Sequence, residues 1–212
     1  MSRRVVILAR HFPPLISGGA RRPFLLAKRL LAEGHKVVVV SPVQSDSVPS
    51  IAVPHPAPEM AHGVSETVNS LKDKIREWLM LPDADIRWAL KASRVALPFT
   101  PDWIITTSPP ESLHVAGFLM KRRTGVRWIA DFRDHWLAAP LLPIRRRSAL
   151  RRRVEAMIAQ YILSRADAAI GVTDGICAEI RTFCPNMPLE KIVMAENFGP
   201  DAPSGTPPDR NP

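Results

Sequence analysis

The stretch RVVILARHFPPLISGGARRPFLLAKRLLAEGHKVVVVSP, residues 4–42, decides the fold class of this 212-residue chain. Short apolar runs at residues 4–9 and 36–42 enclose a helical pattern whose apolar positions fall on one face, namely Phe24, Ala27, Leu30 and Leu31. Gly34 stands where this helix should end. A buried strand, a helix and a second buried strand in this order are typical of a parallel α/β sheet.

The rest of the chain repeats this alternation. We expect further strands in residues 50–54, 101–110, 126–132, 167–173 and 191–199. Helices are expected over residues 68–79, 83–97, 112–125, 150–161 and 174–183. Residues 44–63 are predicted to form a long loop, and residues 200–212 a disordered tail rich in Pro and Gly.

Polar loops should gather at one edge of this sheet. In an open parallel sheet, ligands bind beyond the carboxyl ends of the strands. The loops expected there are HFPPLISGGARR (11–22), TTSPPES (106–112), DFRDHW (131–136), VTDG (172–175) and ENFG (196–199), and all five contain charged residues. The clustering predicts the place of a site but not its chemistry.

The glycine pair Gly18 and Gly19 lies between the first strand and the first helix. The loop contains neither GxGxxG nor GxxxxGK[ST], so it favours neither a dinucleotide-binding motif nor a P-loop. A helix N-terminus that carries Arg21 and Arg22 nevertheless suits an anion, because free N–H groups and the helix dipole add to the charges. The alternative is a flexible turn with solvated arginines, and the residues themselves leave both readings open.

The segment DFRDHW holds Asp131, Arg133, Asp134 and His135 within five residues at a strand end. Such a group can orient a sugar hydroxyl or act as an acid or base. The alternative is a surface salt bridge between Arg133 and a neighbouring carboxylate. Of the six histidines, only His114 and His135 fall near the expected ligand edge.

The formal net charge of +9 is concentrated in residues 121–123 and 145–153. The second run lies beside Leu150, Val154 and Met157, and a basic stretch next to an apolar stripe can settle on an anionic membrane surface. A solvated helix face is the alternative. We expect no nucleic-acid partner, because neither a recognised motif nor an aromatic stacking platform accompanies the charge.

Two further observations concern metals and location. Cys177 and Cys184 do not form a CxxC pair and have no Cys/His cluster beside them, so we expect no metal site. Without an apolar stretch of about 20 residues, and with an opening run too short for a signal peptide, we expect a cytoplasmic protein, held at the inner membrane surface if the basic helix binds lipid.

Four segments in order, residues 12–42, 101–136, 165–180 and 191–199, resemble the N-terminal, acceptor-side half of family 4 glycosyltransferases of GT-B architecture, most of all bacterial surface-polysaccharide enzymes. The resemblance implies a Rossmann-like parallel sheet with helices on both faces, formed by residues 1–199. It implies transfer of a sugar from a nucleotide sugar to a glycan or lipid-linked acceptor, with no cofactor besides that donor substrate.

The resemblance also implies roles for individual residues. Arg133 and Asp134 would be catalytic, lining the reaction centre. The substrate-binding residues would be Gly18, Gly19 and Arg21 at the donor's diphosphate, Ser108, Glu111 and His114 at the acceptor, and Asp131, His135 and Asn197 at the same edge. Phe198 interrupts the Asn-Gly pair that the family has at this point, and His135 stands where relatives often have proline.

One part of the family pattern is missing from the sequence. The donor-binding C-terminal domain, with its pair of glutamates, is absent, and the predicted tail stands where it would begin. We therefore keep alternatives to an active glycosyltransferase: a non-catalytic binding module, a truncated remnant, or half of a split enzyme whose donor-binding domain is a separate partner. Whether the chain is an enzyme by itself stays open at this stage.

Overall fold

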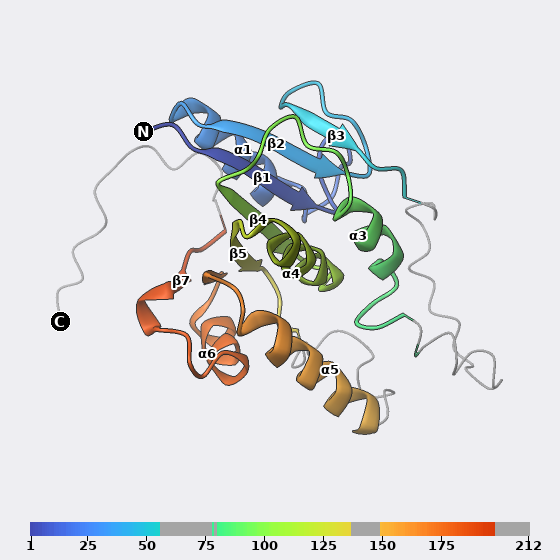
Figure 1. Ribbon diagram of the computed structural model, residues 1–212, viewed down its shortest axis with the longest axis vertical. Coiled ribbons are helices and arrows are strands. Elements are labelled where there is room, and N and C mark those ends of the chain that lie inside the picture. Colours follow the sequence, from blue (N-terminus) through green and yellow to red (C-terminus); the bar gives the residue numbers. More distant parts are fainter. Residues whose placement is uncertain (56–77, 79, 137–148, 198–212) are drawn as a thin grey trace.

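The computed structural model describes residues 1–55, 78, 80–136 and 149–197 (Figure 1). Its strands are β1 (Arg4–Ala9), β2 (Lys36–Ser41), β3 (Ser50–Ala52), β4 (Trp103–Ser108), β5 (Arg127–Phe132), β6 (Ala168–Gly171) and β7 (Ile192–Met194). They form one sheet in the order β3-β2-β1-β4-β5-β6-β7. Every neighbouring pair is parallel, which confirms the predicted fold class.

The helices connect these strands along the chain. They are α1 (Arg21–Ala32), α3 (Ile86–Ala92), α4 (Ser112–Thr124), α5 (Ala149–Leu163) and α6 (Asp174–Phe183), with a short 3₁₀ turn η2 (Leu189–Lys191) before β7. Gly34 and Gly125 follow α1 and α4 with φ of +81° and +71°, a conformation that favours glycine. The Thr173 hydroxyl accepts a hydrogen bond from the Ile176 amide and so caps α6.

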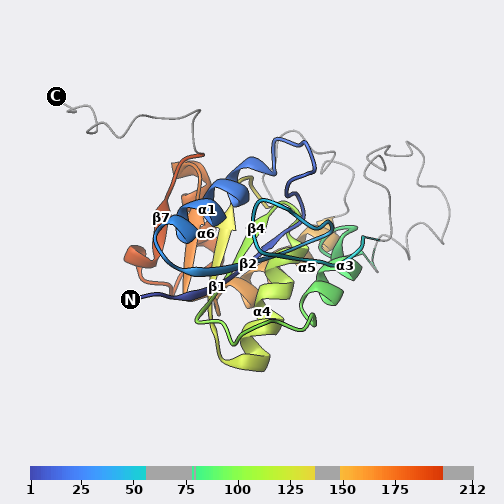
Figure 2. The same cartoon turned by 90° about the horizontal axis from the view of Figure 1, so that it is seen from above.

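Two apolar cores cover the two faces of the sheet. Because side chains alternate along a strand, Val5 and Ile7 of β1 pack with α1, whereas Val6 and Leu8 belong to the larger core formed with α3, α4, α5 and α6. Figure 2 shows α1 and α4 on opposite sides of β1 and β2. The helices therefore lie on both faces, as in a Rossmann-like fold.

The region before β4 differs from its prediction. The helix expected over residues 83–97 spans only Ile86–Ala92. The Arg123 guanidinium donates to the Ser93 carbonyl, which is thereby satisfied without a further helical turn. Asp83 accepts hydrogen bonds from the Asp85 and Ser112 amides, so it supports the start of α4 as well as the turn before α3.

Some predictions fall outside the described residues. These are the tail at 200–212, almost all of the helix over 68–79, and residues 145–148 of the second basic run. The described part of the expected 44–63 loop contains β3.

The order of the strands fixes where a ligand can bind. From β1 the chain moves outward to β2 and β3, and then crosses back to β4 on the other side of β1. The loops that leave the carboxyl ends of β1 and β4 therefore diverge, and this topological switch point is where open α/β sheets bind ligands.

Candidate functional site

A cavity of about 280 Å³ lies at the switch point. Loops that follow four strands of the sheet supply its lining. The lining residues are His11, Ser17, Gly18 and Gly19 after β1, Pro109 after β4, Arg133 and Asp134 after β5, and Asn197 after β7. Five of the eleven residues predicted from the sequence thus come together, from segments as far apart in the chain as Gly18 and Asn197.

Arg133 connects three of these segments. Its Nε donates to the Ser108 carbonyl at 2.8 Å, one terminal nitrogen to the Gly19 carbonyl at 2.5 Å, and the other to the Pro109 carbonyl at 3.0 Å. Burial lowers the pKa of the guanidinium, and Asp131 and Asp134 act in the opposite direction. Two of its five N–H bonds donate to nothing in the part of the chain that the structure describes.

The two glycines occupy different surroundings. A Cβ added at Gly19 would stand 2.7 Å from a terminal nitrogen of Arg133, whereas one added at Gly18 would meet nothing within 4 Å. Within the described ranges, neither glycine amide donates a hydrogen bond. The helix that follows has Ala20 as its N-cap, without a side-chain cap. Open amides in front of an uncapped helix form a place for an anion.

Arg22 forms a second connection between segments that lead to the cavity. Its Nε and one terminal nitrogen donate to the Asp131 carboxylate at 2.8–3.2 Å, and the other terminal nitrogen donates to the Ala195 and Glu196 carbonyls at 2.9 and 2.8 Å. Arg22 is 7% exposed and Asp131 1%, so the pair is buried. It joins the first turn of α1 to β5 and to the segment that leads to Asn197.

The lining also contains a carboxylate, an amide and a hydroxyl. Asp134 and Asn197 are exposed. The Ser17 hydroxyl is buried and has no hydrogen-bond partner among the described residues. A carboxylate, an amide and a hydroxyl in one small cavity can accept from sugar hydroxyls and donate to phosphate oxygens.

Five other predicted site residues lie away from the lining. Arg21 is exposed on the first turn of α1, and Glu111 is the N-cap residue of α4. Ser108 is fully buried and contributes its carbonyl to Arg133. The Asp131 carboxylate is engaged by Arg22, and His135 Nδ1 pairs with Glu179 at 2.7 Å.

His114 is placed differently from its prediction. The sequence put it at the ligand edge, but its side chain is fully buried in the core, 4.3 Å between ring centroids from Phe132. Its Nδ1 hydrogen-bonds the Thr106 hydroxyl at 2.9 Å, and burial lowers its pKa to about 3. Because α4 turns this position toward the sheet, His114 does not belong to the cavity.

The sequence predicts Arg21 as a phosphate ligand and Arg22 only as part of the charge at this helix N-terminus, whereas the structure buries Arg22 against Asp131. His11, Ser17 and Pro109 are not predicted as site residues. They stand in loops expected at the ligand edge, and no residue-level pattern distinguishes them from their neighbours.

The described residues contain no group of three or more His, Cys, Asp or Glu side chains that could hold a metal ion. Cys177 and Cys184 are buried free thiols, and burial raises the pKa of Cys184 to about 11. No helix in the described ranges is long and apolar enough to cross a bilayer.

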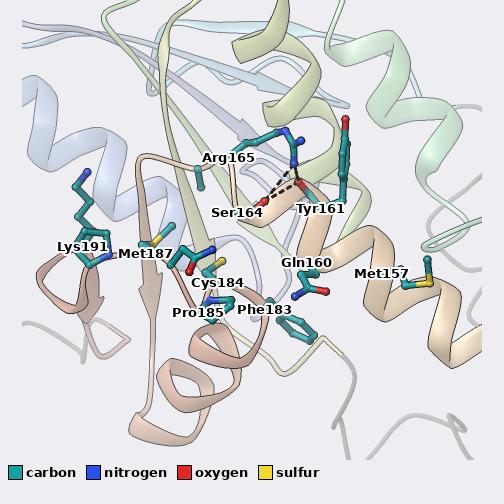
Figure 3. Close-up of a pocket in the computed structure, with 13 residues that line it drawn as sticks. Met157, Gln160, Tyr161, Ser164, Arg165, Phe183, Cys184, Pro185, Met187 and Lys191 are labelled. Carbon is teal, nitrogen blue, oxygen red and sulfur yellow. Dashed lines mark hydrogen bonds between the residues drawn. The ribbon is translucent and has the colours of Figure 1, made fainter.

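A larger cavity, of about 620 Å³, lies at the opposite edge of the sheet (Figure 3). It is lined by the end of α5 and by the segment between α6 and β7, which both precede strands. In Figure 3, Arg165 lies over the ring of Tyr161, with its guanidinium carbon 3.7 Å from the ring centroid. Met157 and Lys191 stand on its rim.

The comparisons with known proteins identify the family and agree with the fold. Residues 17–197 match the family model described as a glycosyl transferase 4-like domain. A glycosyltransferase from Rickettsia africae matches with a TM-score of 0.52 at 13% identity, over 92% of this chain and 43% of its own.

The catalytic domain of starch synthase IV from Arabidopsis thaliana, bound to ADP and acarbose, matches with a TM-score of 0.53 at 11% identity, over 93% of this chain and 52% of its own. The chain thus spans about half the length of these structures. No curated protein matches the sequence significantly.

Proposed function

This chain belongs to the family of glycosyl transferase 4-like domains, and from that premise we propose that residues 1–199 form the acceptor-side half of a sugar-transferring enzyme of GT-B architecture. In the complete enzyme, a sugar would pass from a nucleotide sugar to a glycan or lipid-linked acceptor. One observation carries the proposal: four loops that are distant in sequence converge on a polar cavity at the switch point of the sheet.

The donor's diphosphate suits the glycine side of this cavity. Gly18 and Gly19 line the cavity just before the uncapped start of α1, so free amides and the positive end of the helix dipole are available on this side. The two remaining N–H bonds of Arg133 add donors that carry charge. Starch synthase IV, which has this fold, holds ADP, and its diphosphate is the chemistry that we assign to this cavity.

The reacting sugar suits the opposite side of the cavity. Asp134 can accept a hydrogen bond from a sugar hydroxyl, and the buried charge of Arg133 beside it can stabilise negative charge that develops on the leaving phosphate. We assign these two residues to the reaction centre, with Asn197 as an amide contact. Ser108 and Glu111, at the end of β4 and the start of α4, border the expected acceptor side.

The described cavity accounts for one wall of a donor site. The matched structures are about twice as long as this chain, and we propose that a donor-binding domain faces the cavity and excludes water from it. Exclusion of water strengthens the electrostatic interactions on which transfer depends. If no such domain meets this chain, a binding module without catalysis is the second candidate.

Calorimetric titration with ADP and UDP tests the donor half-site. We expect weak binding by these 212 residues, in the high micromolar to millimolar range, because the proposed donor-binding domain would supply the remaining contacts. Arg165→Met, in the cavity at the opposite edge, is the control and should leave the affinity unchanged. If neither nucleotide binds at millimolar concentration, the donor half-site is overturned.

For a lipid-linked acceptor, we propose that α5 lies on an anionic membrane surface. One face of α5 carries three apolar side chains that are each more than half exposed, namely Leu150, Met157 and Tyr161. Their spacing of seven and four residues places them on this one face. Arg153 is exposed beside them. Apolar side chains flanked by cations fit the interface of an anionic bilayer.

Co-sedimentation with vesicles tests the membrane surface. Vesicles that contain phosphatidylglycerol should carry the protein down at low salt, and pure phosphatidylcholine should not. Met157→Ser should weaken sedimentation, whereas Val193→Ser, which removes an exposed apolar side chain from β7, should not. Equal sedimentation of the two variants would remove α5 from the proposal.

A further inference from the structure

We infer that Arg133 is the positioning residue of the switch-point cavity and that Gly19 is a glycine because Arg133 occupies the space that a side chain there would need. The nature of the ligand rests on the proposed function, but the relation between the two residues does not. Gly19 thus serves the cavity by leaving room for Arg133, and not only through its own amide.

A methyl group at position 19 would force the Arg133 guanidinium to move, and the guanidinium could move only by giving up the hydrogen bonds that hold it. A Cβ there would stand 2.7 Å from one terminal nitrogen of Arg133 and 3.3 Å from the other. Backbone conformation does not explain the glycine, because among the described residues only Gly34 and Gly125 have positive φ. The requirement at position 19 is therefore steric, and its cause is a guanidinium that arrives from the loop after β5.

Gly18 provides the internal comparison. It also lacks a positive φ, and a Cβ added to it meets no atom within 4 Å. A methyl group therefore fits at position 18 but would collide with Arg133 at position 19. The sequence alone does not distinguish the two glycines, whereas their surroundings in the structure differ.

Arg133 also determines which groups face the cavity. Its three hydrogen bonds engage the carbonyl oxygens of Gly19, Ser108 and Pro109. Without the guanidinium, the Gly19 and Pro109 carbonyls would lose this donor at the edge of a cavity that is proposed to hold an anion, and the Ser108 carbonyl would keep only the backbone amide of residue 133. Arg133 satisfies these oxygens and holds the loops after β1 and β4 at a fixed separation.

Arg22 adds further hydrogen bonds between the segments that line the cavity. It fastens the first turn of α1 to Asp131 and to the carbonyls of Ala195 and Glu196. Through the two arginines, all four segments that line the cavity are tied to one another. A site that has its donors in place before the ligand arrives does not spend binding free energy on ordering them.

A double-mutant cycle tests the relation without any ligand. The probes are the exchange rates of two amides: that of Ala20, which donates to the Ser17 carbonyl, and that of residue 133, which donates to the Ser108 carbonyl. Gly19→Ala and Arg133→Ala should each raise both rates at least tenfold. Gly18→Ala, the matched control, should change them less than twofold.

The double variant decides the mechanism. If the methyl group acts by displacing Arg133, adding Gly19→Ala to Arg133→Ala should change the rates less than twofold. Multiplicative effects would overturn the inference. Arg133→Lys, which keeps the charge but has a single nitrogen for three carbonyls, covers the case in which Arg133→Ala fails to fold, and wild-type exchange rates in this variant would also overturn it.

Affinity for ADP extends the test to the ligand. Gly19→Ala and Arg133→Lys should each weaken ADP binding at least tenfold. Ile162→Val, a core substitution far from the cavity in α5, should lower stability but leave the affinity unchanged. If wild type binds ADP and Gly19→Ala binds it equally well, the positioning role is wrong. If wild type binds neither ADP nor UDP, the proposed function fails, and the exchange cycle alone decides the inference.

Discussion

At the carboxyl edge of the sheet, a cavity of about 280 Å³ is lined by loops that the buried Arg22 and the half-buried Arg133 tie together. The cavity of about 620 Å³ at the amino edge is lined mostly by exposed side chains, together with the buried Phe183 and Cys184. Among the described residues, Arg165 of the larger cavity binds only Tyr161 and Ser164 at the end of its own helix, and it lies over the Tyr161 ring. The contrast teaches that preorganised polar groups, and not volume, identify the candidate site.

We expect the largest loss of stability from a substitution at the carboxyl edge. Arg22→Met leaves the Asp131 carboxylate buried without its main partner, so we expect the free energy of unfolding to fall by about 3–5 kcal/mol. Arg165→Met, its counterpart at the amino edge, should cost about 1 kcal/mol or less because the side chain is exposed. Urea denaturation measures both, and equal losses would remove the structural difference between the edges.

A double variant tests whether the loss of stability comes from the unpaired Asp131 carboxylate. If the loss comes from the uncompensated carboxylate, replacing it as well, as in Arg22→Met with Asp131→Leu, should restore part of the stability. A double variant as unstable as the single one would show that the hydrogen bonds to Ala195 and Glu196 carry the effect.

The next effect concerns His114, which the structure assigns to the core instead of the carboxyl edge. Burial lowers its pKa from 6.5 to about 3, so between these values the unfolded chain binds a proton that the folded chain does not. Stability should therefore fall as the pH drops below 6.5, by about 2 kcal/mol at pH 5 relative to pH 8.

His114→Phe serves as the comparison, because it keeps a ring beside Phe132 and removes the titration. Asp83 acts in the opposite direction, since burial raises its pKa to about 6, and so the difference between wild type and variant is the quantity to measure. Parallel stability curves from pH 8 to pH 5 would place His114 in contact with solvent, at the carboxyl edge after all.

The fold could be predicted because each strand and helix carries its own periodic signal. Residues 4–42 contain two apolar runs, a one-sided helix and a glycine with positive φ after it, and all of these are local. The carboxyl edge could be located for the same reason, since the loops that follow parallel strands must meet there.

The roles of neighbouring residues could not be predicted, because they depend on tertiary contacts. Arg21 and Arg22 are identical in the sequence, but a rotation of about 100° per residue leaves one in solvent and turns the other toward Asp131. Gly18 and Gly19 differ only through Arg133, which lies more than a hundred residues away. His114 follows an exposed-looking loop, but its side chain points into the core.

We expect the smallest effects from removing one hydroxyl at each edge, a change that should affect ADP binding and stability differently. The Ser17 hydroxyl in the carboxyl-edge cavity is buried without a hydrogen-bond partner in the described residues, so Ser17→Ala should change the free energy of unfolding by about 0.5 kcal/mol or less. If the hydroxyl donates to a nucleotide diphosphate, the same variant should weaken ADP binding about threefold to tenfold. Ser164→Ala, which removes a hydroxyl from the amino-edge cavity, should leave ADP binding unchanged. Calorimetry and urea denaturation on both variants check this, and an unchanged affinity in Ser17→Ala would mean that the orphaned hydroxyl contributes nothing to the ligand and that the carboxyl-edge cavity depends on its two arginines and its open amides.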